Sequence, residues 1–93
     1  MWYTYILRCT NNSYYTGVTN NLQKRLDAHN NGKGAKYTRA NKPCELVWHM
    51  EHATKEEAMR TEWYIKQKDH KWKHSLIVGR VNFEEQGNNT SLF

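Results

Sequence analysis

The beginning of the chain contains two segments rich in aromatic and β-branched residues, separated by residues that favour turns. Residues 2–9 and 14–19 have the composition of β-strands, and residues 10–13 supply Thr, Asn and Ser between them. This order predicts an antiparallel hairpin. Alternate side chains of a strand share one face, so Tyr5 is expected to share a face with Leu7, and Tyr15 with Gly17.

The remainder of the chain is predicted to add one strand and further helices. A helix is expected from a cap at Thr19 or Asn20 to about residue 31, where Asn-Gly ends it. Residues 45–50 are predicted to form a third strand. Thr54 with Glu three residues later is a capping-box pattern, which opens a helix through about residue 68. A third, basic helix is expected over residues 70–79.

The predicted order is β-β-α-β-α-α, which indicates an α+β fold: a small three-stranded antiparallel sheet flanked by helices. A chain of 93 residues, 38% hydrophobic, has room for one compact domain. We expect this domain over residues 1–81 and a polar, flexible tail over residues 82–93. No apolar run is long enough for a membrane span and no signal peptide is recognisable. Cys9 and Cys44 lack metal-ligand spacing and are expected as buried strand residues in a reducing cytoplasm.

Basic residues outnumber acidic ones, with fourteen Lys and Arg against nine Asp and Glu and a formal charge of +5. This balance favours a polyanionic partner, nucleic acid above all. The candidate phosphate-binding loop contains Lys33, Lys36, Tyr37, Arg39 and Lys42. A second candidate surface contains Lys66, Lys68, Lys71 and Lys73. The alternative for both is an ordinary solvated face, and Tyr37 could also stack on an unpaired base.

Polar side chains fall on the predicted core-facing side of the first helix. Leu22 and Leu26 define that side, and residues 22, 25, 26 and 29 follow the i, i+3, i+4, i+7 spacing of one helical face. Arg25 and His29 are therefore expected to face the core, where an unpaired polar group is costly.

The second helix repeats this pattern with an acidic residue. Its apolar face is expected to contain Ala58, Met59 and Ile65, and Glu62 falls near the middle of that arc. One reading is a structural ion pair between Arg25 and Glu62, or an Arg25 side chain that extends to the rim. The other reading is a functional polar cleft where both helices meet the sheet.

Taken together, these residues resemble the GIY-YIG nuclease family. Tyr3-Thr4-Tyr5 and Tyr15-Thr16-Gly17 are similar to the two tyrosine motifs of the family. Arg25 and His29 match its helix residues, Glu62 matches its metal-binding glutamate, and residues 32–39 resemble a segment of the small, single-domain bacterial members. The first motif lacks its glycine and isoleucine. Val18 stands where some repair-type relatives have a lysine.

The resemblance implies hydrolysis of a nucleic-acid phosphodiester with one divalent cation, Mg²⁺ or Mn²⁺. Glu62 would bind this ion, since magnesium takes one or two carboxylates together with waters and phosphate oxygens. Arg25 would bind the scissile phosphate. Tyr5 is our choice for the group that takes the proton of the attacking water, with Tyr15 as the group that positions water or substrate.

Tyr5 would need a lowered pKa to accept this proton, because a phenol with a pKa near 10 is rarely ionised at pH 7. Arg25 nearby, or a hydrogen bond from His29, would have to lower that pKa, which makes His29 an orienting or proton-relaying partner. Gly17 would allow a close backbone approach. The other histidines, His49, His52, His70 and His74, are expected at the surface or in local hydrogen bonds. Trp48 and Trp63 are expected in the core rather than as base-stacking platforms.

Three functional hypotheses follow. The first is a metal-dependent endonuclease that cuts one strand per active site, on DNA that is branched, damaged or single-stranded, with a role in DNA repair or recombination. The second is a nucleic-acid-binding module with weak or no activity. The third is a nuclease subunit that depends on a targeting protein or on a second copy of itself.

Overall fold

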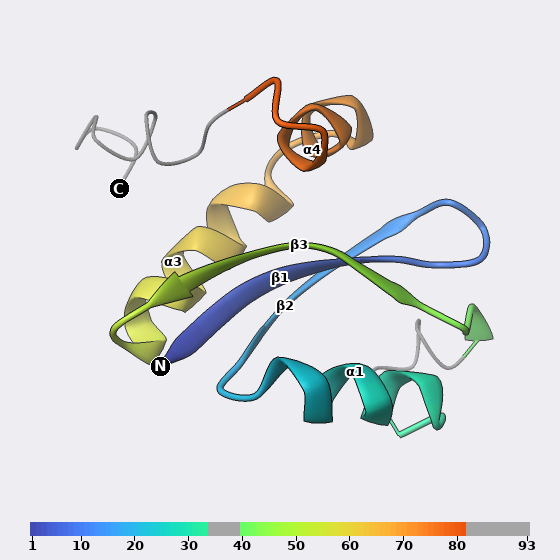
Figure 1. Cartoon of the computed structure of the whole chain (residues 1–93). Helices are drawn as coiled ribbons and strands as arrows, with labels where there is room; N and C mark the ends of the chain where they lie inside the picture. Colours follow the sequence, from blue (N-terminus) through green and yellow to red (C-terminus); the bar gives the residue numbers. More distant parts are fainter. Residues whose placement is uncertain (34–39, 82–93) are drawn as a thin grey trace.

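The protein forms a three-stranded antiparallel sheet with helices on both faces (Figure 1). The computed structural model describes residues 1–33 and 40–81, so the predicted tail lies outside the described residues. The elements are β1 (Trp2–Arg8), β2 (Tyr14–Thr19), α1 (Leu22–Asn30), β3 (Glu45–His52), α3 (Lys55–Lys66) and α4 (His70–Ile77). The predicted α+β class and element order are confirmed.

The strands are arranged in the order β2-β1-β3, so β1 lies in the centre and β2 at an edge. β1 pairs with β2 in the register Tyr5↔Gly17 and Leu7↔Tyr15. Paired residues of an antiparallel ladder point to the same side of the sheet. Tyr5, Leu7, Tyr15 and Gly17 therefore belong to one face, as the alternation predicted.

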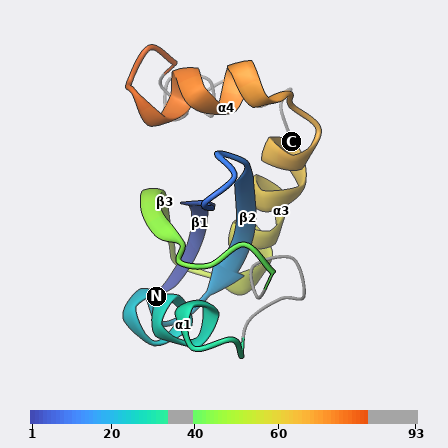
Figure 2. The same cartoon turned by 90° about the vertical axis from the view of Figure 1, so that its right-hand side faces the viewer.

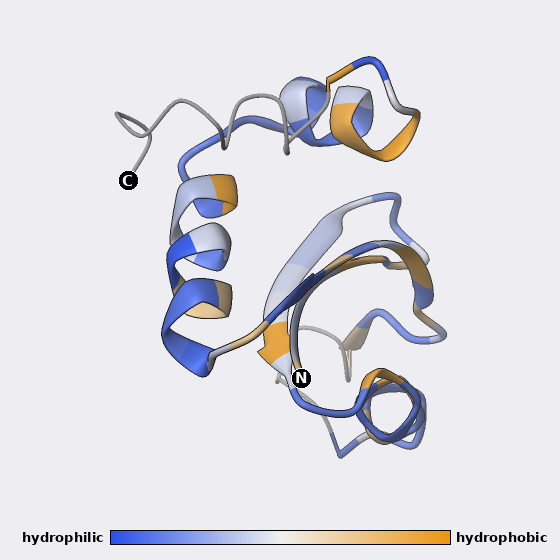
Figure 3. Ribbon diagram, turned by 60° about the vertical axis from the view of Figure 1, so that its left-hand side comes forward, coloured by the Kyte–Doolittle hydropathy of each residue, from blue (hydrophilic) through white to orange (hydrophobic). Residues whose placement is uncertain are grey.

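Two hydrophobic clusters cover the two faces of the sheet. On one face, Leu22 and Leu26 of α1 pack against buried Tyr5, Leu7, Cys9 and Cys44. On the other face, Ile65 of α3 and Leu76 of α4 pack against Ile6. Figure 2 shows α1 and α3 on different sides of the sheet, and in Figure 3 the most hydrophobic parts of the α1 and α3 ribbons lie on the side toward the sheet. Both cysteines are buried and free, just outside the ends of β1 and β3.

The helix ends follow local capping chemistry, with one correction to the sequence analysis. The α1 cap is Asn21, whose side-chain oxygen accepts from Lys24 N at 3.0 Å, rather than Thr19 or Asn20. Thr19 is still paired in β2, and its hydroxyl oxygen accepts from Asn21 N instead. Thr54 caps α3 as predicted and accepts from Glu57 N at 3.2 Å.

The outward face of α3 also differs from the prediction. Met59 and Trp63 were expected in the core, but they are 49% and 64% exposed. The buried face of α3 consists of Ala58, Thr61 and Ile65. Residues of a helix are separated by about 100° each, so Met59 and Trp63 lie well away from this buried arc. Trp48, by contrast, packs against the Ile6 cluster as expected.

Candidate active site

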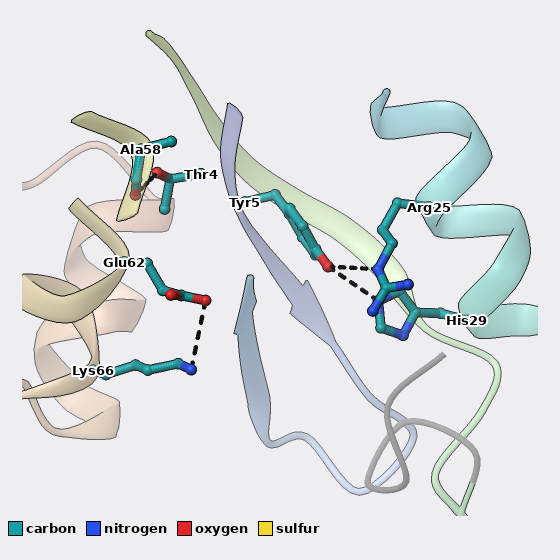
Figure 4. A network of polar contacts seen from close by, with 7 residues as sticks. All are labelled: Thr4, Tyr5, Arg25, His29, Ala58, Glu62 and Lys66. Carbon is teal, nitrogen blue, oxygen red and sulfur yellow. Dashed lines mark hydrogen bonds and ion pairs between the residues drawn. The ribbon is translucent and has the colours of Figure 1, made fainter. Parts of the chain in front are cut away.

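The hydroxyl group of Tyr5 lies between two polar side chains of α1. Tyr5 extends from the central strand toward α1, and Arg25 and His29 extend back toward it (Figure 4). Arg25 Nε donates to Tyr5 Oη at 3.4 Å, and Tyr5 Oη lies 3.1 Å from His29 Nε2. Tyr5 is 2% exposed and His29 is fully buried. The structure thus unites three of the predicted site residues in one contact network.

The position of Arg25 and His29 follows from the helical spacing seen in the sequence. Asn21 caps the start of α1, and Leu22 and Leu26 seat the helix on the sheet. Arg25 and His29 share that inward side, and Arg25 is only partly buried. The predicted core-facing orientation is therefore confirmed.

Burial sets the electrostatics of this network. Burial raises the pKa of Tyr5 above its ordinary value; the hydrogen bond from Arg25 works in the opposite direction but does not overcome it. Burial, together with the Arg25 cation, lowers the pKa of His29 to about 4. The lowering of the Tyr5 pKa that a resting phenolate would require is therefore not found. At neutral pH Tyr5 is a phenol and His29 a neutral imidazole that can accept a proton.

Tyr15 and Gly17, both on β2, lie against the side chains of this network. The Tyr15 ring lies 5.2 Å from the His29 ring and 6.4 Å from the Tyr5 ring, measured between centroids. Gly17 lies directly beneath Tyr5, and a Cβ atom there would come within 2.6 Å of Tyr5 Cζ. The close approach predicted at Gly17 is therefore made by the ring of Tyr5. Because β2 is an edge strand, this contact brings the Tyr5 hydroxyl over the edge of the sheet.

Glu62 approaches from the other face of the sheet (Figure 4). Its Oε2 forms an ion pair with Lys66 Nζ at 3.5 Å, and its side chain is 25% exposed. Arg25 instead binds Tyr5, so the Arg25–Glu62 ion pair considered from the sequence is wrong. Glu62 is still close enough to Tyr5 for its negative charge to contribute to the raised pKa of Tyr5.

The residues around Glu62 fit a metal site with a single protein carboxylate. No cluster of three or more His, Cys, Asp or Glu side chains suited to an ion occurs within the described ranges. A lone, partly exposed carboxylate is a suitable ligand for magnesium when waters and substrate phosphate oxygens complete the coordination. The donor set therefore fits a single ion that is completed by the substrate, rather than a preformed protein cage.

The predicted phosphate-binding loop is only partly described. Lys33 and Lys42 are both exposed. A Cβ atom at Gly32 would lie 3.3 Å from Lys42 Nζ, so the Lys42 side chain reaches back to the end of α1. Lys36, Tyr37 and Arg39 lie outside the described residues.

Comparison with known proteins identifies the family. The family model of the GIY-YIG catalytic domain matches residues 1–75. The chain belongs to the GIY-YIG family. Its resemblance to these nuclease domains is thereby confirmed, over most of the described fold.

Its relatives are small proteins of similar length. A UPF0213 protein of Bacillus pumilus is 49% identical over 84 residues, which cover 90% of this chain and 85% of the relative. UPF0213 protein YazA of Bacillus subtilis is 44% identical, with 87% and 82% covered. The solution NMR structure of a UPF0213 protein from Bacillus halodurans is 43% identical, covers 84% of each chain and has a TM-score of 0.54.

Two contacts of this GIY-YIG domain were not predicted. Asn30 follows His29 and binds both backbone groups of Cys44, accepting from N at 2.6 Å and donating to O at 3.2 Å. These bonds join the end of α1 to the start of β3 beside the site. Lys66 was predicted only as a phosphate contact, and its pairing with Glu62 follows from the i, i+4 spacing.

The remaining histidines follow their predicted roles in part. His70 Nε2 donates to the Asn12 carbonyl at 2.9 Å, and His74 Nδ1 lies 3.2 Å from the Tyr14 hydroxyl. His49 is exposed, whereas His52 is only partly exposed, with a buried Nε2. No helix in the described part of the chain is long and apolar enough to cross a membrane.

Proposed function

We propose that this chain is a metal-dependent endonuclease that hydrolyses nucleic-acid phosphodiester bonds, with DNA as the substrate. The observation that carries the proposal is the Tyr5 hydroxyl, held between the Arg25 guanidinium and a neutral His29 imidazole. Membership of a nuclease family supports it independently.

The raised pKa of Tyr5 leads us to a relay rather than a resting phenolate. Tyr5 Oη accepts a proton from the attacking water while its own proton passes to His29 Nε2, 3.1 Å away. The water oxygen forms a bond to phosphorus, the bond from phosphorus to the leaving oxygen breaks, and the leaving oxygen takes up a proton from solvent. His29 then returns its proton to solvent, since its pKa of about 4 favours the neutral form at pH 7.

Arg25 and Glu62 would hold the substrate around this relay. Arg25 binds Tyr5 through Nε, and its terminal nitrogens would bind phosphate oxygens and offset charge in the transition state. Glu62 would bind one Mg²⁺ or Mn²⁺, which supplies Lewis-acid stabilisation of the phosphate when bound. Tyr15 lies beside His29, where it can orient water or substrate.

The same proposal covers the number of strands cut, the contacts to the substrate backbone and the cellular role. One such site cuts one strand, so cleavage of both strands would need repositioning, a targeting partner or a homodimer. Lys33 and Lys42, with Lys36, Tyr37 and Arg39, are proposed to bind the phosphate backbone. The cysteine content suits a cytoplasmic protein, and a nuclease of this kind would act in DNA repair or recombination.

A cleavage assay tests the proposal. Wild type, Glu62→Ala and Arg25→Ala are incubated with labelled duplex, single-stranded and branched DNA and with RNA, in Mg²⁺, Mn²⁺ or chelator. Lys24→Ala is the matched control, because Lys24 is an exposed cation next to Arg25 on α1. Cleavage should require metal and be lost in both site variants but not in the control. Full activity of Glu62→Ala would remove the metal-site assignment.

The ion pair of Glu62 supports a second candidate function. Lys66 already neutralises the carboxylate that would bind metal, as expected of a module that binds nucleic acid without cutting it. In that case the assay would show binding that weakens with rising salt, and no cleavage on any substrate.

A further inference from the structure

An exposed tryptophan and methionine lie on the outer side of α3. Trp63 is 64% exposed and Met59, one turn earlier, is 49% exposed. Within the described residues, the side chain of Trp63 has no hydrogen bond and no ring contact. A large indole that contributes so little to the fold raises the question of what it binds.

Helical geometry links this tryptophan to the candidate metal ligand. Lys66 lies one turn after both Glu62 and Trp63, at i+4 from the first and i+3 from the second. Lys66 Nζ contacts Glu62 Oε2 at 3.5 Å, so the lysine head group lies beside the carboxylate. Side chains at these spacings are neighbours, about 5–6 Å apart at Cβ. A continuous surface therefore leads from Glu62 over Lys66 to Trp63.

The chemistry of this surface matches an unpaired nucleotide. Arg60 precedes Trp63 by three residues and is exposed, so cations lie on both sides of the indole. An aromatic face between cations suits single-stranded nucleic acid: the ring stacks on a base, and the cations bind the flanking phosphates. Two apolar side chains form too small an area for a stable protein interface. In a dimer formed through this surface, the cations of the two copies would also repel each other.

We infer that the Trp63 surface, formed by Met59, Arg60, Trp63 and Lys66, binds an unpaired base about one or two nucleotides from the scissile phosphate. The substrate class would then be single strands, or duplexes with unpaired nucleotides beside the cut. This inference rests on the proposed nuclease function and adds a substrate preference to it. It also replaces the core role predicted for Trp63.

Binding measured without metal tests the inference separately from cleavage. Fluorescence anisotropy would compare wild type, Trp63→Ala and Trp63→Phe on labelled single strands, overhang duplexes and blunt duplexes, in chelator. Val78→Ala is the matched control, because Val78 is a 50% exposed apolar side chain at the end of α4. Trp63→Ala should weaken binding of single strands and overhangs about tenfold, as expected for the loss of one stacked base. Blunt-duplex binding should change less than about twofold, and Trp63→Phe should retain most of the affinity.

The possible outcomes separate this inference from the proposed function. An equal loss on all substrates, or no loss in Trp63→Ala, would overturn the stacking role and leave nuclease activity standing. A wild-type dimer that becomes monomeric in Trp63→Ala by sedimentation would overturn it in favour of a self-interface. Preference for unpaired nucleotides together with unchanged cleavage by Glu62→Ala would support the Trp63 surface and count against the proposed active site. Circular dichroism verifies that each variant is folded.

Discussion

The candidate site has two halves that are built in opposite ways. The tyrosine half, with Tyr5, Arg25 and His29, is packed between β1 and α1, and its hydrogen bonds are present in the free protein. The glutamate half is a partly exposed carboxylate on α3, paired with one exposed lysine, Lys66. The first half is preorganised by the core, whereas the second needs ligands from outside the protein.

This difference matches the two tasks of the proposed reaction, proton transfer in the tyrosine half and metal binding in the glutamate half. Proton transfer needs donors and acceptors at fixed short distances, so its groups belong in a rigid interior. A magnesium ion keeps several waters and accepts substrate phosphate, so its protein ligand belongs at an accessible edge. Substitutions in the tyrosine half should therefore change both folding and activity, and those in the glutamate half activity alone.

Removal of the Tyr5 hydroxyl should have the largest effect. Tyr5→Phe deletes the proposed proton acceptor and should slow cleavage by about 10²–10⁴-fold, as expected for loss of a general base. It also leaves a buried His29 Nε2 without its Tyr5 contact, which should cost about 1–3 kcal/mol of unfolding free energy. Cleavage rates and urea denaturation measure the two effects. Tyr3→Phe is the control, two residues earlier on the same face of β1: it removes only a hydroxyl bonded to the exposed Glu51, so cleavage should be unchanged and the unfolding free energy should change far less than in Tyr5→Phe.

Acidification should lower the free energy of unfolding, because His29 of the tyrosine half becomes protonated. Its pKa is about 4 in the folded protein, below the ordinary value near 6.5, so the unfolded chain binds the proton more readily. The stability contributed by neutral His29 is present above pH 6.5 and is lost as pH falls toward 4. The loss from pH 7 to pH 4 should approach about 3 kcal/mol.

Urea denaturation across this pH range measures the effect, with His29→Gln as the comparison. The variant carries no titrating group at residue 29, so its stability should fall less over the same range. Parallel pH profiles of the two proteins would show that His29 is solvated and that the network is not preorganised.

A side chain at Gly17 should displace the Tyr5 ring. Gly17→Ala places a Cβ within 2.6 Å of Tyr5 Cζ and should cost about 1–3 kcal/mol, with a loss of activity. A Tyr5→Leu background removes the ring, so the same substitution should cost less there. Gly79→Ala meets no atom within 4 Å and tests the effect of positive φ alone. Equal costs in both Tyr5 backgrounds would contradict the proposed contact.

Much of the fold could be predicted from the sequence because it depends on short-range signals. Strand alternation placed Tyr5 with Leu7 on one face, and the i, i+4 spacing placed Arg25 with His29 on the inner side of α1. Thr54 was recognisable as a cap from its local pattern. These signals need only the geometry of one element.

The features that could not be predicted from the sequence are those that depend on packing between elements. Periodicity did not fix which arc of α3 meets the sheet, so Met59 and Trp63 were assigned to the core. The Arg25–Glu62 pair was proposed without knowledge that the sheet separates α1 from α3. The direction of the Tyr5 pKa depends on burial, which outweighs Arg25 and which the sequence does not display.

The smallest effect on folding should come from the glutamate half. Glu62→Gln removes a partly exposed i, i+4 ion pair with Lys66 and should change the unfolding free energy by less than about 0.5 kcal/mol. The same substitution should abolish metal-dependent cleavage, because an amide is a much poorer magnesium ligand than a carboxylate. Lys66→Met is the matched control for the ion pair: it should be equally mild for stability and retain metal dependence. If Glu62→Gln instead destabilised the protein by as much as Tyr5→Phe, Glu62 would belong to the preorganised half, and the division of the site would be wrong.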